Sequence, residues 1–253
     1  GVTGIGVGDR VIGGAAIPHG GLAQVCVMRA SEAHQAPVSL DDAAASALHV
    51  AYQTGWFGLH RRAGLQPGET LLVHAAAGGV GVAAVQLGKV AGARVIGVVG
   101  SAAKADVARA AGADVVVVRG EQDFVEVVKE FTGGRGADVV FDPVGGDSYA
   151  KSTKCIAFEG RIVVLGFTSG EIPQPGLNHA LVKNYSILGL HWGLYRARDP
   201  QAVRDCHAEL CRLADGGFIA PWVSERVSLE QAPDALRRLG AGTTTGRVVV
   251  VPD

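Results

Sequence analysis

The 253-residue sequence lacks several features that mark common classes of protein. Its 23 Lys and Arg nearly balance its 24 Asp and Glu, so it has no basic excess to attract nucleic acids or anionic membranes. Its four cysteines form no CxxC pair, which argues against a disulfide framework or structural zinc and favours a reducing, cytoplasmic setting. With 48% hydrophobic residues, the composition indicates a folded, soluble protein without nucleic-acid or membrane partners.

Long uninterrupted hydrophobic runs are also missing. The longest uncharged stretch runs from Thr70 to Gly88, but Gly78, Gly79 and Gly81 interrupt it, so we interpret it as a strand, a turn and a helix. A basic segment followed by an apolar one is absent at the start, so no signal peptide is expected. The sequence begins with glycine, and its single methionine is Met28. We therefore expect residues upstream to have been removed or left out.

Apolar runs rich in β-branched residues alternate with helical patterns from Thr70 onward. The four valines at 115–118 are typical of strands buried on both faces of a parallel sheet. The pattern predicts an α/β fold, a Rossmann doubly wound parallel sheet. The predicted strands are 70–75, 94–99, 114–118, 138–142, 161–167 and 186–191, and the predicted helices are about 79–92, 102–112, 123–132, 147–158 and 199–215.

The two ends of the sequence differ from this alternating middle. Residues 1–50 are rich in glycine and contain short strand-like pieces, which suggests a small β domain. A helix is expected from Ser39, whose hydroxyl would cap it, and the tail predicts a helix followed by a strand over 248–251 that returns to the first domain. We therefore divide the chain into 1–50, 51–217 and 218–253.

The strand ending at His74 leads into a glycine-rich turn that differs from GxGxxG by Ala76 at the first glycine position. Gly78 would let the backbone approach a pyrophosphate, and Gly81 would let the following helix pack closely on the strand. Amides at the start of that helix would face the phosphates. Because the turn heads a series of βα units, it predicts dinucleotide binding rather than a purely structural turn.

The acidic residue that would bind an adenosine ribose is missing after the second strand, where Gly100 and Ser101 follow two valines. Without this carboxylate, a 2′-phosphate meets no repulsion, and Ser101, Lys104 and Arg119 can donate to it. The sequence therefore predicts NADP(H) rather than NAD(H). The alternative is that Lys104 and Arg119 are ordinary solvated charges.

Seven segments in order along the chain resemble the medium-chain dehydrogenase/reductase superfamily, specifically its zinc-independent quinone oxidoreductase (zeta-crystallin-like) branch. They are Val7–Val11, Leu65–Thr70, His74–Gly81, Ala110–Asp114, Asp142–Gly146, Gly160–Phe167 and Thr245–Val249. The resemblance implies a GroES-like catalytic domain on both sides of the Rossmann domain, here N-terminally truncated so that 1–50 is a partial one. It also implies a metal-free site, because the family's cysteine-rich zinc lobe is absent.

The resemblance also implies which residues surround the cofactor. Arg119 departs from it, since relatives often carry Tyr or His there. The turn after the fifth strand would approach the nicotinamide, and Thr54 would lie near the carboxamide. The implied cofactor residues are Ala77, Gly78, Gly79, Val80 and Gly81 with Arg247 at the pyrophosphate, Gly100, Ser101 and Lys104 at the ribose and its phosphate, and Gly166, Phe167 and Thr168 at the nicotinamide.

Three aromatic residues, Tyr52, Trp192 and Tyr195, are candidates for lining a pocket in which a flat quinone or enone stacks on the nicotinamide. The alternative is that they are core or dimer-contact aromatics. His74 is interpreted as a strand histidine rather than a proton donor, and no catalytic residue is assigned.

The sequence and its resemblance together predict an NADPH-dependent reductase that transfers hydride to a quinone or an α,β-unsaturated carbonyl without a metal. Two alternatives stay open: an enoyl-CoA thioester reductase, for which the adjacent Arg61 and Arg62 are a hint, and a non-catalytic NADPH-binding protein. The apolar segment 187–190 predicts an edge strand that pairs with its twin in a homodimer.

Overall fold

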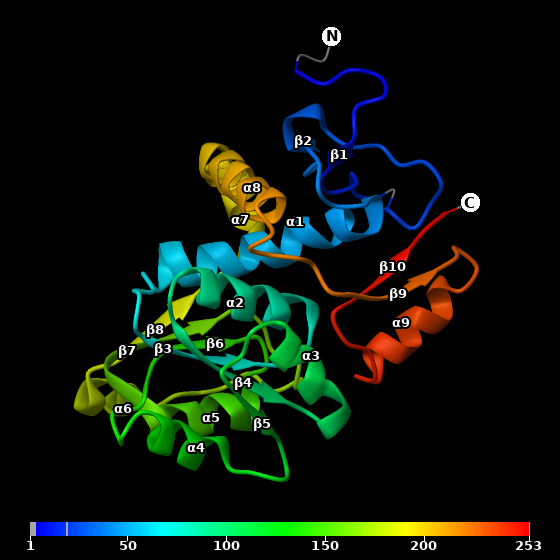
Figure 1. Cartoon of the computed structure of the whole chain (residues 1–253). Helices are drawn as coiled ribbons and strands as arrows, with labels where there is room; N and C mark the ends of the chain where they lie inside the picture. Colours follow the sequence, from blue (N-terminus) through cyan, green and yellow to red (C-terminus); the bar gives the residue numbers. More distant parts are fainter. Residues whose placement is uncertain (1–3, 19, 253) are drawn as a thin grey trace. The chain divides into compact units, whose positions relative to one another are not determined.

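A six-stranded sheet organises residues 54–192 (Figure 1). The computed structural model describes residues 4–18 and 20–252 of the chain. The strands are ordered β5-β4-β3-β6-β7-β8, and every neighbouring pair is parallel. This is the order of a doubly wound dinucleotide-binding sheet, in which the chain reverses direction across the sheet between β3 and β6. The predicted α/β class with a Rossmann-type sheet is confirmed.

Helices connect these strands along the chain. The elements of this unit are β3 (Thr70–His74), α2 (Gly79–Val90), β4 (Arg94–Val99), α3 (Ala105–Ala110), β5 (Val115–Val118), α4 (Phe124–Phe131), β6 (Ala137–Asp142), α5 (Gly146–Cys155), β7 (Ile156–Val164), α6 (Leu177–Lys183) and β8 (Ser186–Gly189). All six predicted strands are present. The prediction was wrong at β7, which begins at Ile156 inside the predicted helix, because Ile156 and Ala157 are buried and Ile156 pairs with Ala137.

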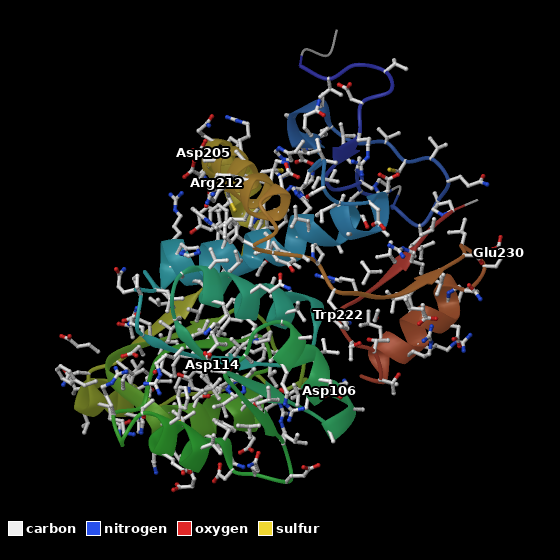
Figure 2. The ribbon with its side chains drawn as sticks, in the orientation of Figure 1. Asp106, Asp114, Asp205, Arg212, Trp222 and Glu230 are labelled. Carbon is white, nitrogen blue, oxygen red and sulfur yellow. The ribbon has the colours of Figure 1, made fainter. Side chains whose placement is uncertain are left out.

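Two acidic side chains of this unit lie on α3 and directly before β5. Asp114 precedes β5, and Asp106 lies on α3 (Figure 2). The Asp114 carboxylate accepts hydrogen bonds from Lys89 Nζ at 2.8 Å and from the Val95 amide at 2.7 Å. An acidic side chain thus holds the beginning of β4.

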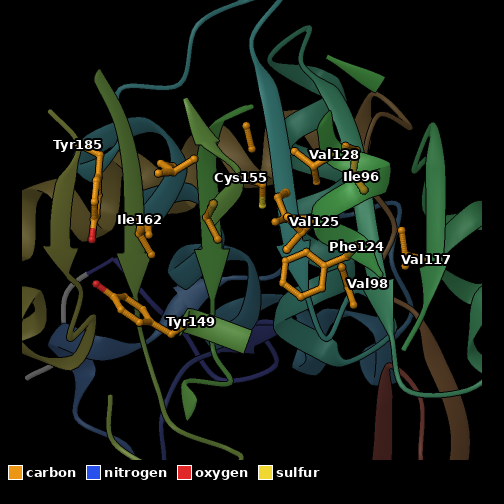
Figure 3. Close-up of a cluster of buried hydrophobic side chains, with 14 residues drawn as sticks. Ile96, Val98, Val117, Phe124, Val125, Val128, Tyr149, Cys155, Ile162 and Tyr185 are labelled. Carbon is orange, nitrogen blue, oxygen red and sulfur yellow. The ribbon is translucent and has the colours of Figure 1, made fainter. Parts of the chain in front are cut away.

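The core on one face of the sheet forms where α4 and α5 pack against the strands (Figure 3). Full burial of a Val, Leu, Ile or Phe side chain stabilises a protein by about 1.5–3 kcal/mol, so this layer contributes much of the unit's stability. Its members include Leu72, Ile96, Val98, Val117, Val140 and Ile162 from the strands and Phe124, Val125, Val128, Tyr149 and Cys155 from the two helices.

Residues 1–53 and 193–253 form a separate compact unit. The helix α1 begins in this unit and ends in the other. The elements are β1 (Val11–Ile12) and β2 (His34–Gln35), which are antiparallel, α1 (Asp42–Trp56), α7 (Gly193–Arg198), α8 (Pro200–Asp215), β9 (Val223–Val227), α9 (Ala232–Gly240) and β10 (Arg247–Val250). The boundary at residue 53 lies close to the predicted boundary at 50, whereas α7 and α8, predicted as part of 51–217, group with this unit.

The tail and the start of α1 correct two details of the sequence prediction. An unpredicted strand, β9, pairs in parallel with β10, so α9 connects two strands of one small sheet. Asp41 rather than Ser39 caps α1, since its Oδ1 accepts the Ala44 amide at 2.8 Å, while the Ser39 amide donates to Asp215. The pairing of β9 and the contact of Ser39 depend on partners distant in sequence.

The uncharged stretch from Thr70 to Gly88 forms β3, a turn and most of α2, as predicted. In the part of the chain that the structure describes, no helix has the length and apolar character needed to cross a membrane.

Candidate dinucleotide-binding site

The turn between β3 and α2 forms the centre of the candidate site. The five residues of β3 are all buried, and Ala75 directly after them adopts a left-handed backbone with φ of 51°. Such a conformation costs a non-glycine residue about 1–2 kcal/mol, so surrounding contacts must stabilise it. The Ala76 amide donates to Val98 O at 3.0 Å, and the Gly78 amide donates to Ala75 O at 2.9 Å. These bonds fix the turn above the ends of β3 and β4.

The start of α2 is built for close contact and for an external acceptor. A Cβ at Gly81 would lie 2.1 Å from Ala75 O, so only glycine lets the helix approach the strand end this closely. Gly78 is the residue before the helix and provides no side-chain cap. The first-turn amides of α2 have no acceptor within their own helix, and the helix dipole favours a negative charge in front of them.

The end of β4 leads into an exposed segment without an acidic residue. Gly100 and Ser101 are exposed, and a Cβ at Gly100 would meet nothing within 4 Å. Residues 102–104 form one 3-10 turn, in which the Lys104 amide donates to Ser101 O at 3.0 Å. Ser101 is the extended residue directly before this turn, and Lys104 is its last residue, so both belong to the short segment that follows β4.

Arg119 follows β5 and is exposed. It lines a hollow of about 200 Å³ together with Gly145, Asp147 and Ser148 from the loop after β6 and the start of α5. Ser101 and Lys104 do not line this hollow. Arg119 therefore lies beside residues that follow β6. Its predicted role at the 2′-phosphate stays a prediction.

Two loops continue the carboxyl edge of the sheet beyond the glycine turn. The β6 loop comprises residues 143–146, and the β7 loop comprises residues 165–171. Asp142, fully buried at the end of β6, accepts the amides of Val144 at 2.8 Å and Gly145 at 3.0 Å through Oδ1. Burial raises the pKa of Asp142, although these two amides and Arg119 act in the opposite direction. The predicted nicotinamide-contacting residues Gly166, Phe167 and Thr168 lie in the β7 loop, with Phe167 and Thr168 exposed.

His74, at the end of β3, is completely buried, in agreement with its interpretation as a strand histidine. Its Nε2 lies 2.8 Å from Ser152 Oγ, and the Ser152 hydroxyl donates to Ser148 O. Burial, together with the charge of Arg119, lowers the pKa of His74 to about 3. His74 is thus neutral at physiological pH and ties β3 to α5.

Thr54 is half-buried in the last turn of α1, and Trp192 is buried after β8. Both belong to the unit that contains the sheet. Gly55, next to Thr54, packs on α2, where a Cβ would lie 3.0 Å from Leu87 Cδ1. The chain near Thr54 is therefore held close to the helix that begins at the glycine turn.

The remaining predicted residues, Tyr52, Tyr195 and Arg247, belong to the other unit. Tyr52 is almost completely buried, and burial raises the pKa of its hydroxyl. Tyr195 is half-buried in α7. Arg247 begins β10 and lines a hollow of about 440 Å³ with Ser46, Ala47 and the end of β10, and burial lowers the pKa of its guanidinium. A desolvated guanidinium of this kind suits an anionic ligand.

Within 4–18 and 20–252, no three His, Cys, Asp or Glu side chains gather closely enough to hold a metal ion. The four cysteines are free thiols.

Sequence reasoning missed two parts of this site. It did not single out Ala75, because a positive φ at alanine follows from the path of the turn and leaves no mark in the sequence. It also gave Asp142 no role of its own, although the Asp-Pro that ends a buried strand could have signalled an Asx-type turn, in which an aspartate side chain accepts amides two or three residues ahead.

Comparisons with known proteins match this geometry. The family model described as zinc-binding dehydrogenase matches residues 79–208. A quinone oxidoreductase-like protein 2 homolog from Nematostella vectensis is 39% identical over 251 residues, which cover 98% of this chain and 68% of that protein. The quinone oxidoreductase of Escherichia coli, solved with NADPH, is 32% identical with a TM-score of 0.81, covering 88% of this chain and 69% of that one. A mycobacterial protein solved with NADPH is 31% identical with a TM-score of 0.90, covering 99% and 76%.

A parallel sheet with this strand order and a glycine turn at its switch point defines a dinucleotide-dependent oxidoreductase of the NAD(P) type. With these relatives, the chain belongs to the medium-chain dehydrogenase/reductase superfamily, among its quinone oxidoreductase-like members. The two solved structures contain NADPH, and members of this family use NAD(P)H.

Proposed function

We propose that this protein binds NADPH and acts as a reductase that transfers hydride to a quinone or another α,β-unsaturated carbonyl without a metal. One observation carries the proposal: the glycine turn at the switch point of the sheet stands beside a second strand end that is followed by no acidic residue but by Ser101 and Lys104 in one short segment. The first feature suits a pyrophosphate and the second suits a 2′-phosphate.

The residues of the turn fit a dinucleotide. Ala77, Gly78, Gly79 and Val80 would lie against the pyrophosphate, where the first-turn amides of α2 can donate to it. Gly81 keeps the helix close enough to the strand for this contact, since any side chain there would meet Ala75 O. Arg247, whose guanidinium is desolvated, is the cation that the family resemblance assigns to the pyrophosphate.

At the adenosine end, Gly100 would lie against the ribose, and Ser101 and Lys104 would donate to the 2′-phosphate. Arg119 is a weaker candidate for that phosphate, because it lines a hollow with acidic Asp147 and Glu171 instead. The preference for NADPH over NADH therefore depends mainly on Lys104.

At the other end of the cofactor, Gly166, Phe167 and Thr168 would approach the nicotinamide, with Thr54 near its carboxamide. Bound NADPH would supply the hydride. The protein would orient two flat partners and donate hydrogen bonds to the developing oxyanion. Tyr52, Trp192 and Tyr195 are the candidate substrate-lining residues. The buried hydroxyl of Tyr52, with its raised pKa, is a poor acid, so we assign it no proton transfer.

Lys104→Glu tests the cofactor assignment. We expect NADPH affinity to fall at least tenfold, because an attractive charge at the 2′-phosphate becomes repulsive, while NADH affinity changes little. Fluorescence titration of both cofactors measures the two constants. Lys154→Glu is the matched control, since Lys154 is an exposed lysine in the last turn of α5. An equal loss of NADPH and NADH affinity in Lys104→Glu would contradict the assignment.

The substrate class is tested by following NADPH oxidation at 340 nm with 1,4-benzoquinone and with crotonyl-CoA, each with and without EDTA. Turnover of the quinone that EDTA does not change supports the proposal. Preferential turnover of crotonyl-CoA favours the enoyl thioester alternative, for which the exposed Arg61 and Arg62 could bind the CoA phosphates. NADPH binding without any turnover favours a binding protein.

Two further properties belong to the same proposal. The exposed edge strand β8 supports a homodimer formed by strand pairing between two copies, which light scattering would measure. The four free thiols support a reducing cytoplasmic compartment.

A further inference from the structure

Asp142 is a buried acid to which the proposed function gives no part. It is fully buried at the last position of β6, where an isolated carboxylate would be costly. Its Oδ1 accepts the amides of Val144 and Gly145 at 2.8 and 3.0 Å, which closes a tight turn directly after the strand. Its Oδ2 has no hydrogen-bond partner in the described residues. The side chain therefore acts on the backbone of the β6 loop through one oxygen.

The β6 loop in turn accepts hydrogen bonds from the β7 loop. The Thr168 amide donates to Pro143 O at 3.1 Å, and the Ser169 amide donates to Val144 O at 3.1 Å. The Ser169 hydroxyl donates to the same Val144 carbonyl at 2.8 Å. The acceptors of these three bonds are carbonyls of the two residues directly after Asp142, so the β7 loop takes its position from the loop that Asp142 holds.

The two loops also touch where the β6 loop turns. Gly145 has φ of 71°, and a Cβ there would lie 2.9 Å from both Glu171 O and Phe167 Cδ1. The Gly146 amide donates to Glu171 O at 3.2 Å. With this contact and the bonds to Thr168 and Ser169, the β7 loop contacts the β6 loop at its middle and at its last residue.

A second buried contact fixes the helix that follows the β6 loop. Val73 and Phe141 are partners in the parallel register of β3 and β6, so His74 and Asp142 occupy the next positions of the two strands and face the same side of the sheet. His74 bonds to Ser152, which holds α5 one turn and a half beyond the loop. This contact holds α5 independently of Asp142. The β6 loop lies between β6 and α5, and its own position depends on Asp142.

We propose that Asp142 is the positioning residue of the nicotinamide-contacting turn: by holding the amides of Val144 and Gly145 it sets where Gly166, Phe167 and Thr168 lie. This inference rests on the proposed function, which assigns that turn to the nicotinamide. Asp142 itself lies below the loop surface and binds neither cofactor nor substrate. Its loss therefore changes the orientation of the reacting ring more than the affinity for the cofactor, which is held by the glycine turn and Lys104.

Three variants separate positioning from general stability. Asp142→Ala removes the acceptor of both amides. Asp142→Asn keeps an acceptor oxygen for both amides. Its NH2 group replaces Oδ2, which makes no hydrogen bond in the described residues, so no existing bond is lost and the β6 loop is expected to keep its position. Asp138→Ala is the matched control, because Asp138 is a buried acid at the amino end of the same strand, where it accepts the Thr70 amide at 2.7 Å.

Hydrogen–deuterium exchange of peptides covering 165–171 tests the positioning directly and needs no activity. The amides of Thr168 and Ser169 are expected to exchange at least tenfold faster in Asp142→Ala than in the unmodified protein, and at unchanged rates in Asp142→Asn and Asp138→Ala. Equal acceleration in Asp142→Ala and Asp138→Ala, or none in Asp142→Ala, would overturn the proposal. If Asp142→Ala does not fold, the proposal is decided by Asp142→Ser, which is expected to accelerate exchange of the same amides.

A kinetic readout then links position to function. In single-turnover reduction of 1,4-benzoquinone, Asp142→Ala is expected to lower the rate about a hundredfold, the loss typical of a 1 Å misplacement, with NADPH affinity within threefold of the unmodified protein. A loss of affinity as large as the loss of rate would overturn the positioning role. Failure of the unmodified protein to oxidise NADPH would contradict the proposed function instead, and the exchange experiment would still decide whether Asp142 holds the turn.

Discussion

Gly81 and Gly100, two glycines of the candidate site, lie in opposite surroundings. A side chain at Gly81 would collide with the carbonyl of Ala75, whereas a side chain at Gly100 would meet open space. The glycine motif in the sequence reflects the requirement at Gly81, because close helix–strand contact needs a residue without Cβ. The second glycine is not needed for folding, so a constraint on it would have to come from a ligand.

Alanine substitutions at these positions are expected to separate folding from binding. Gly81→Ala should lower the free energy of unfolding by about 3 kcal/mol, because the backbone must move away from Ala75 O. Gly100→Ala should leave stability within about 0.5 kcal/mol, because nothing lies within 4 Å of the added atom, and yet weaken NADPH binding at the proposed ribose contact. Urea denaturation and fluorescence titration measure the two effects. Unchanged NADPH affinity in Gly100→Ala would remove Gly100 from the site.

The elements of the sheet are held differently at their two ends. At the amino edge, three acidic side chains each accept a hydrogen bond from a backbone amide and form an ion pair with a cation. Asp138 accepts the Thr70 amide, Asp114 the Val95 amide and Glu69 the Gln66 amide. At the carboxyl edge, Asp142 holds loop amides, and no cation in the described part of the chain forms an ion pair with it. The amino edge therefore serves stability, and the carboxyl edge is where the chain forms its candidate site.

Removing a charge from the amino edge should cost stability without affecting the cofactor. Arg161 of β7 binds both oxygens of Glu69 at 2.8 Å and donates to Ala63 O at 2.9 Å, with both charged side chains about four-fifths buried. Arg161→Met is expected to lower the free energy of unfolding by about 2 kcal/mol, since it leaves Glu69 without its partner. NADPH affinity should not change. Urea denaturation and cofactor titration check both.

The control for this variant is Arg212→Ala on α8, which breaks an exposed pair with Glu209 and should cost less than about 0.5 kcal/mol. If Arg161→Met weakened NADPH binding as strongly as it weakened folding, the assignment of stability to the amino edge and of the candidate site to the carboxyl edge would be wrong.

Sequence reasoning recovered the parts of the fold that depend on local pattern. The six strands and the glycine turn follow from apolar runs and turn residues, and five of the strands were placed within two residues at both ends. The strand β9 was missed because Val223-Ser-Glu-Arg-Val reads as polar, and it becomes a strand only by pairing with β10 about twenty residues later. The contacts of Asp142 were missed for the same reason, since they require loops that meet in space.

Across the whole molecule, both compact units contain buried histidines. His74 is buried in the sheet unit. In the other unit His49 and His207 are buried and His34 is half-buried, and the rings of His34 and His207 stack at 4.7 Å. Burial, together with the neighbouring imidazoles, lowers the pKa of His34 to about 4 and that of His49 to about 3. Burial also lowers the pKa of His207. Arg196 and Arg204 repel a proton on this cluster, while Glu32 attracts one.

This arrangement predicts loss of stability in acid. An unfolded histidine takes up its proton near pH 6.5, whereas the folded His34, His49 and His74 do so near pH 3–4. As pH falls below 6.5 the unfolded chain binds more protons, so the stabilisation is complete above pH 6.5 and is lost progressively towards pH 3–4. For His49 alone the loss at pH 4.5 is on the order of 2 kcal/mol. Thermal unfolding between pH 7.5 and 4.5 should show a steep fall in Tm.

Replacing His49 tests the origin of this pH dependence. His49→Gln removes one titrating group and the repulsion it would exert on His34 and His207, so Tm should fall less between pH 7.5 and 4.5 than in the unmodified protein. His191→Gln, at an exposed histidine of the sheet unit, is the control and should leave the slope unchanged. If Tm fell as much in both variants as in the unmodified protein, the loss of stability in acid would not come from His49. His74→Asn would then test whether it comes from the sheet unit, because His74 is the buried histidine that ties β3 to α5.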